Sequence, residues 1–123
     1  MAAVDPRSPC LIGVAQRTWH RSGVEQAPEP LAMNHEVVRA AAADTGAAAD
    51  AVLAAVDRLD VVHCMSWPYD DPVARLAASL DLSPSAGSYS GIGGTVPLQL
   101  LTAAAKSIVG GELDVAVLAG AEA

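Results

Sequence analysis

Short apolar runs alternate along the chain with longer segments whose apolar residues recur every three or four positions. The runs at residues 10–15, 59–65 and 115–119 are rich in valine, leucine and isoleucine. The first and last of these runs hold no polar residue, which is typical of buried strands in a parallel sheet. The run at 59–65 also predicts a strand, because it is rich in β-branched residues. Residues 85–92 predict a further strand, which is weak because the stretch holds two glycines and three serines. We therefore expect four strands.

Two helices are predicted between the first two strands. Pro30 suits the first turn of a helix and Gly46 suits its left-handed end, so the first helix lies between them. We expect Asp50 to cap a second, shorter helix that runs to about Val56.

Two more helices follow the second and third predicted strands. Asp71 and Pro72 form a strong helix start. The aspartate side chain can cap the free amides, and proline fits the first turn because its missing N–H would have no partner there. This helix covers 73–80. The last helix covers 95–109 and ends at two glycines. Its expected buried stripe has the spacing of one helix face and consists of Leu98, Leu101, Ala105 and Ile108.

This order of strands and helices predicts an α/β fold with three layers, in which helices cover both faces of a mainly parallel mixed sheet. With 52% hydrophobic and 17% charged residues, the 123-residue chain is typical of one globular domain. We expect residues 1–8 to be disordered and residues 9–123 to form the domain. The chain ends directly after an apolar strand, so we expect the domain to be incomplete and truncated.

The charge of the chain argues against several kinds of partner. Seven basic and fourteen acidic residues leave a net charge of −7, which repels nucleic acid and anionic lipid surfaces. No segment approaches the roughly 20 apolar residues of a membrane span, and the first residues do not form a secretory signal, so we expect a cytoplasmic protein. Cys10 and Cys64 are too few for a disulfide framework or a metal site. We expect both to be buried.

A glycine-rich turn between the third predicted strand and the last helix is the main candidate for chemistry. Its substrate-binding candidates are Tyr89, Ser90, Gly93 and Gly94. Free amides and the helix dipole at such a turn favour an anion or a developing oxyanion. A dinucleotide site is an alternative, but Val96 replaces the third glycine of that fingerprint. The glycines could also serve close helix packing alone.

Other polar and aromatic residues have simpler interpretations. Tyr89 and Ser90 have no base at a suitable spacing, which favours a structural role. His63 lies in a predicted strand and is expected to be a hydrogen-bonded core histidine. Trp19 and His20 lie in a long polar loop, where they could contact a ligand or simply pack on the surface.

Several segments together resemble the thiolase superfamily, specifically the sterol-carrier-protein-type thiolases and the proteins described as acetyl-CoA acetyltransferases. The resemblance covers nearly the whole chain and corresponds to about the first third of such a protein. The similar segments are Leu-Ile-Gly-Val-Ala-Gln-Arg at 11–17, Asp-Pro-Val-Ala-Arg-Leu-Ala at 71–77, the serine-rich strand, residues 98–108, Gly-Glu-Leu-Asp at 111–114 and Val-Leu-Ala-Gly-Ala-Glu at 117–122.

The resemblance implies where the catalytic group would lie. In these enzymes a cysteine at the start of the helix after the third strand takes up the acyl group. Counting back from Asp114 puts that position at Gly94, which has no side chain. The histidines and the second cysteine of the family come from later sequence. The resemblance therefore implies no catalytic residue in this chain.

Three hypotheses for function follow. The first is the N-terminal part of an acetyl-CoA acetyltransferase-like protein of lipid metabolism, inactive alone, with a coenzyme A thioester as substrate or ligand and no covalently bound cofactor. Its partners would be acyl-CoA, the remainder of its own domain or a partner subunit, and a second copy in a homodimer. The second is a non-catalytic acyl-CoA-binding or scaffolding protein. The third is half of a nucleotide-binding oxidoreductase.

Overall fold

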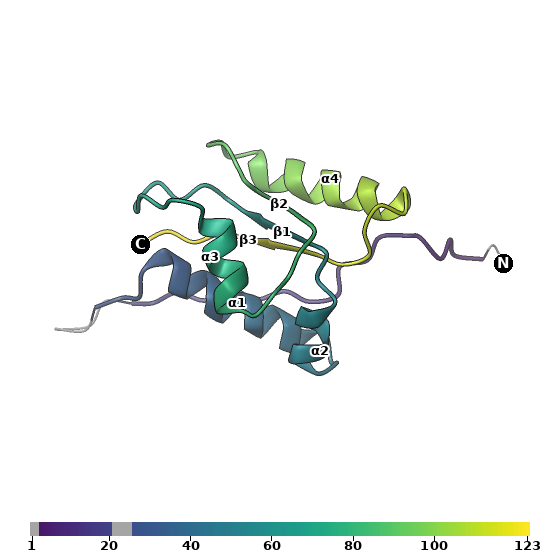
Figure 1. Ribbon diagram of the computed structural model, residues 1–123, viewed down its shortest axis with the longest axis horizontal. Coiled ribbons are helices and arrows are strands. Elements are labelled where there is room, and N and C mark those ends of the chain that lie inside the picture. The colour runs from purple at the N-terminus through teal and green to yellow at the C-terminus, as the bar shows by residue number, and fades with distance from the viewer. Residues whose placement is uncertain (1–2, 21–25) are drawn as a thin grey trace.

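A three-stranded parallel sheet forms the centre of the computed structural model, which describes residues 3–20 and 26–123 (Figure 1). Its strands are β1 (Arg58–Val61), β2 (Ala86–Tyr89) and β3 (Ala116–Ala119), and β1 lies between the other two. The C-terminal residue of β1, Val61, is in register with Tyr89 of β2 and with Ala119 of β3. The three strands therefore end together at one edge of the sheet.

Helices cover both faces of this sheet (Figure 1). One face carries α1 (Pro30–Asp44), α2 (Ala49–Ala54) and α3 (Pro72–Ser79), and the other carries α4 (Val96–Val109). The core lies under the first three helices, where Leu59 and Leu76 are fully buried. Because side chains alternate along a strand, Asp60 points to the opposite face and lines a cavity beneath α4.

Helix starts and ends follow local sequence signals. Pro30 begins α1, and Gly46 adopts the left-handed conformation shortly after its end, as predicted. The cap predicted for α2 is wrong: Ala48 is the N-cap, and Asp50 lies inside the first turn. Because the helix begins earlier than predicted, the Asp50 carboxylate is free to pair with Arg39 at 3.0 Å.

The start of α3 confirms the prediction for Asp71 and Pro72. The Asp71 carboxylate accepts a hydrogen bond from the Ala74 amide at 3.2 Å, and Pro72 is the first residue of the helix. Asp71 is itself left-handed, with φ of 48°, a conformation that aspartate tolerates better than most residues.

The strand predicted at residues 10–15 is wrong. This segment is extended but belongs to no strand, and the exposed fractions of Leu11, Ile12 and Val14 are 77%, 56% and 60%. It runs beside α1 and β3. The Val14 amide donates to the Asp44 carboxylate at 2.9 Å, at the end of α1, instead of to a neighbouring strand.

The cysteines differ in burial. Cys64 is buried with an exposed fraction of 6%, as predicted, whereas Cys10 is exposed, so the prediction for Cys10 is wrong. Cys10 belongs to the extended segment that pairs with no strand, so no neighbouring strand covers its side chain. Both thiols are free.

The stripe predicted to bury one face of α4 is also largely exposed. No residue of α4 is buried, and Leu98 and Leu101 have exposed fractions of 66% and 50%. Ala105 and Ile108 of the predicted stripe are half-buried, and so are Leu100 and Ala104, which the prediction left out. Because apolar residues occur on more than one side of this helix, their spacing alone did not select the face that contacts the sheet.

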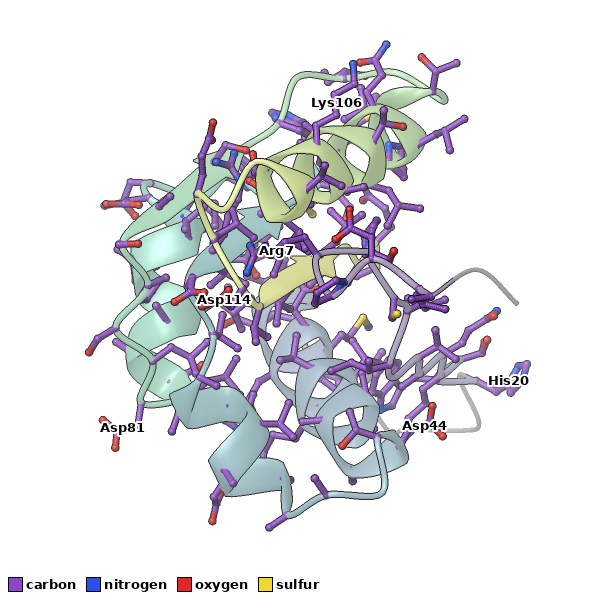
Figure 2. All side chains as sticks on the ribbon, turned by 90° about the vertical axis from the view of Figure 1, so that its right-hand side faces the viewer. Arg7, His20, Asp44, Asp81, Lys106 and Asp114 are labelled. Carbon is purple, nitrogen blue, oxygen red and sulfur yellow. The ribbon has the colours of Figure 1, made fainter. Side chains whose placement is uncertain are left out.

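Arg7 joins the N-terminal segment to the far end of α4. Its guanidinium donates to the carbonyl of Ile108 at 2.8 Å, to that of Leu113 at 2.9 Å, and to the Asp114 carboxylate at 2.7 Å. Figure 2 shows Arg7 close to Asp114.

Among the described residues, no helix reaches the length and apolar character that crossing a membrane requires.

Candidate functional site

The best candidate site lies where the three parallel strands end, because this edge collects polar residues from separate parts of the chain. The Ser90 amide donates to the Val61 carbonyl at 3.0 Å, and the Val62 amide donates to the Ala119 carbonyl at 2.8 Å. These bonds bring together residues 62–66, 89–94 and 120–123. In open α/β sheets ligands bind at this edge.

Tyr89 and Ser90 hold the chain that leaves β1. The Tyr89 hydroxyl accepts a hydrogen bond from the Cys64 amide at 2.8 Å, and its ring stacks on His63 with ring centres 4.9 Å apart. The Ser90 hydroxyl accepts from the His63 amide at 2.9 Å and donates to the Gly91 carbonyl at 2.9 Å. Both hydroxyls are therefore engaged by the backbone of the site.

Glu122 fixes the loop after β1 from the other side. Its carboxylate accepts hydrogen bonds from the Met65 amide at 2.6 Å and the Ser66 amide at 3.0 Å, and the Cys64 thiol lies 3.6 Å away. Hydrogen bonds from the Ser66 side chain and from the Met65 amide lower the pKa of Glu122 to about 2. The group is thus ionised at neutral pH and faces this loop.

The glycine-rich turn is open. A side-chain carbon at Gly91 or Gly94 would meet no atom within 4 Å, and one at Gly93 would lie 3.4 Å from the Val96 side chain. Neither backbone strain nor crowding therefore requires glycine at Gly91 or Gly94, because their φ angles are not in the left-handed region. Close packing of helix on strand does not explain these two residues.

The turn leads directly into α4, whose positive dipole end faces it. Thr95 is the N-cap, but its side chain makes no capping hydrogen bond. The Val96 amide donates to the Gly93 carbonyl at 3.2 Å, and Pro97 has no N–H. The helix start therefore offers fewer free amides to an anion than most helices do.

Two hollows flank the end of β3. The smaller, of about 430 Å³, lies on the α4 side and is lined by residues that include His63, Pro97 and Glu122. His63 is therefore half-buried at the site and not part of the core, contrary to the sequence interpretation.

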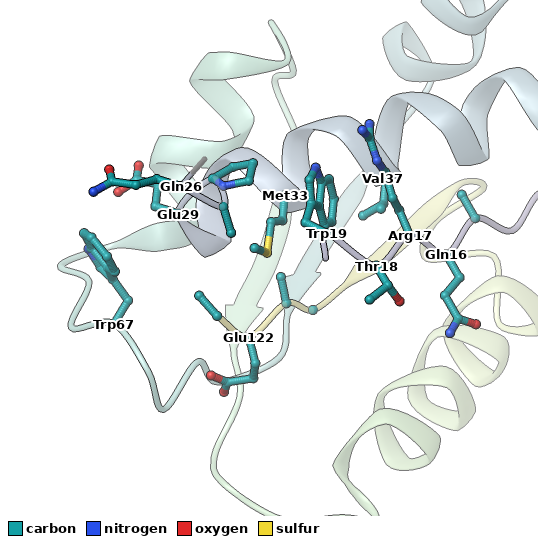
Figure 3. A pocket seen from close by; sticks show the side chains of 16 residues that line it. Gln16, Arg17, Thr18, Trp19, Gln26, Glu29, Met33, Val37, Trp67 and Glu122 are labelled. Carbon is teal, nitrogen blue, oxygen red and sulfur yellow. The ribbon is translucent and has the colours of Figure 1, made fainter. Parts of the chain in front are cut away.

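The larger hollow is a groove of about 1040 Å³ on the α1 side (Figure 3). Trp19 and Trp67 are among its lining residues, and the Arg17 guanidinium lies 4.7 Å from the centre of the Trp19 ring. Arg17 also pairs with Glu36. His20, the other loop residue considered, is exposed and does not line the groove.

All four predicted site residues lie at or just after the end of β2, at this edge of the sheet, but none of them lines either hollow. His63 and Glu122 do line the smaller one. Sequence analysis did not single out Glu122, and it placed His63 inside a strand that the structure ends at Val61. Both residues lie shortly after a strand of the sheet. In a parallel sheet that position alone places a side chain at the strand ends. Within the described residues there is no cluster of three side chains suited to hold a metal ion.

The chain is similar to a known protein at the level of three-dimensional structure. No protein-family model matches the chain, and no curated protein sequence matches it. The crystal structure of a monomeric SCP2-thiolase like protein type 1 from Mycobacterium smegmatis is similar, with a TM-score of 0.83 and 29% sequence identity. The match covers 97% of this chain and 24% of that protein, so this chain spans about a quarter of its length.

Proposed function

We propose that this chain, which has a thiolase-like fold, binds the acyl end of an acyl-CoA thioester at the strand ends and does not form a covalent acyl-enzyme. The predicted thiolase-like α/β fold is confirmed by the structural similarity. One observation carries the proposal: Gly94 leaves open space at the start of α4. By resemblance, this is where the thiolases carry their nucleophilic cysteine.

The shape and charge of the site support the acyl end of the ligand over its phosphates. The hollow of about 430 Å³ beside β3 is within the usual size of ligand pockets, roughly 300–1,000 Å³. The dipole of α4 favours a thioester carbonyl oxygen near Gly94. Glu122 and the net charge of −7 oppose the phosphates of coenzyme A, which would therefore extend away from the site.

The described cysteines give no substitute nucleophile. Cys64 is buried, and its sulfur faces the Ser66 hydroxyl at 3.4 Å and the Glu122 carboxylate at 3.6 Å. Cys10 lines a cavity at the opposite end of α4, beside Ile108. Coenzyme A thioester thus acts in this proposal as a ligand, and any chemistry requires residues outside these 123. A cytoplasmic role in lipid metabolism is part of the same proposal.

Calorimetric titration with acetyl-CoA, acetoacetyl-CoA and NAD tests the ligand class. We expect the two thioesters to bind and NAD not to bind. Binding of NAD would instead support the oxidoreductase hypothesis. Gly94→Leu should fill the open turn and weaken thioester binding at least tenfold, about 1.4 kcal/mol. The matched control is Ala103→Leu, which adds the same side chain at an exposed position farther along α4 and should bind like the unmodified chain.

Activity assays test the absence of a nucleophile. We expect neither thiolysis of acetoacetyl-CoA nor condensation of acetyl-CoA. Turnover that disappears when Cys10 or Cys64 is replaced by serine would contradict the proposed site. Failure of Gly94→Leu to weaken binding in a folded protein would mean that the ligand lies elsewhere.

A further inference from the structure

The imidazole of His63 lies at the proposed ligand site. His63 follows shortly after β1, is half-buried, and lines the hollow of about 430 Å³ on the α4 side. Within the part of the chain that the structure describes, no group forms a hydrogen bond with either ring nitrogen. A neutral imidazole has one N–H donor and one acceptor nitrogen, so both are available to a ligand.

Neighbouring residues hold this ring in one orientation. The His63 amide donates to the Ser90 hydroxyl at 2.9 Å, which anchors the backbone. The ring stacks on that of Tyr89, with the two planes inclined by 21°. The Tyr89 hydroxyl is in turn held by the Cys64 amide at 2.8 Å. A binding group that is oriented before the ligand arrives loses less entropy when the ligand binds.

The hollow offers few other polar side chains. Among the described residues that line it, only His63 and Glu122 are polar, and the others are apolar residues or glycine. The Glu122 carboxylate is ionised at neutral pH and already accepts from the Met65 and Ser66 amides. An ionised carboxylate has no proton to donate. His63 is therefore the side-chain donor that this lining provides.

A thioester carbonyl that enters the hollow needs such a donor, because burying a carbonyl oxygen without a hydrogen bond is unfavourable. The first turn of α4 supplies little help. The Val96 amide already donates to the Gly93 carbonyl, and Pro97 has no N–H. The imidazole N–H of His63 can supply the hydrogen bond that this helix start does not.

We propose that His63 donates a hydrogen bond to the carbonyl oxygen of a bound thioester and thereby distinguishes thioesters from coenzyme A derivatives that lack this oxygen. This inference rests on the proposed function, because it names a contact at the same site. His63 acts in it as a residue that binds and selects the ligand, and no covalent step is involved.

Calorimetric titration with two ligands tests this contact. S-ethyl-CoA has the chain of acetyl-CoA but a methylene group in place of the carbonyl. His63→Phe keeps an aromatic ring to stack on Tyr89 and removes the ring nitrogens. We expect this variant to bind acetyl-CoA about fivefold more weakly and to bind S-ethyl-CoA as tightly as the unmodified chain does.

Two further variants serve as controls. His63→Gln keeps an N–H donor and should recover part of the lost affinity for acetyl-CoA. His20→Phe makes the same chemical change at an exposed histidine that does not line the hollow. It should bind both ligands as the unmodified chain does.

Nitrogen NMR of the imidazole rings gives a second measurement that needs no substitution at the site. The chain has three histidines, His20, His35 and His63. Acetyl-CoA should shift the ring nitrogen resonances of His63 more than S-ethyl-CoA does, and it should leave those of His20 and His35 in place.

The outcomes separate this contact from the binding site as a whole. If acetyl-CoA binds but His63→Phe weakens both ligands equally, or weakens neither, the proposed contact is wrong and thioester binding stands. Equal shifts of the His63 resonances by the two ligands would also overturn it. If the unmodified chain binds no thioester, the proposed function fails and this contact fails with it.

Discussion

Introducing a thiol at the turn after β2 tests whether this turn can support a thiolase-type nucleophile. Gly94→Cys adds its side chain where no atom lies within 4 Å, and the backbone there is not left-handed, so the substitution should not disturb the fold. The introduced sulfur would lie at the start of α4, whose dipole favours the thiolate.

The expected effect on reactivity is modest and can be calculated. A thiol of ordinary pKa, about 8.5, is about 3% ionised at pH 7, and a decrease of one unit raises that fraction to about 24%, roughly eightfold. The lower basicity reduces the reactivity of each thiolate about threefold. The net gain is therefore about threefold. Because Pro97 lacks an N–H and the Val96 amide donates to the Gly93 carbonyl, a much larger gain is not expected.

Brief labelling with iodoacetamide at neutral pH, followed by digestion and mass spectrometry, compares the thiols within one protein. Cys10 is the internal reference because it is exposed, and Cys64 should react most slowly because it is buried. We expect the thiol introduced by Gly94→Cys to react about three times faster than Cys10. Equal or slower labelling in a variant shown to be folded would refute the assignment of Gly94 to the nucleophile position.

Three further predictions concern stability. Gly87→Ala should lower the free energy of unfolding, measured in urea, by about 1–3 kcal/mol, because the added side-chain carbon would lie 2.4 Å from the Leu59 carbonyl oxygen. Gly94→Ala is the control, and an equal loss for it would contradict the open turn. Asp71→Ala should cost about 1 kcal/mol in the same assay through the lost cap, and Asp71→Asn should cost less. Because the pKa of Glu122 falls from 4.5 to about 2 on folding, its stabilisation is complete above pH 4.5 and is lost as the pH falls toward 2. Thermal melts should show this loss for the unmodified chain and a smaller one for Glu122→Gln, so parallel pH profiles would argue against the Glu122 hydrogen bonds.

Local signals in the sequence were sufficient to predict most helices and strands. Pro30 and Gly46 marked the limits of α1, and Asp71 with Pro72 marked the start of α3. Such signals act over a few residues through hydrogen bonds and backbone angles that neighbours in sequence determine. The order of elements then predicted the α/β architecture, and the resemblance of several segments to thiolases predicted the fold that the structural comparison supports.

The tertiary structure alone decided which apolar residues are covered and which polar residues meet. The segment at 10–15 and the Leu98 and Leu101 side chains of α4 are apolar, yet they are largely exposed, because burial depends on a neighbour that distant sequence must supply. Glu122 reaches Met65 and Ser66 across more than fifty residues of sequence. No local pattern encodes that contact. It exists because parallel strands end at one edge, so their following residues converge however far apart they lie in the chain.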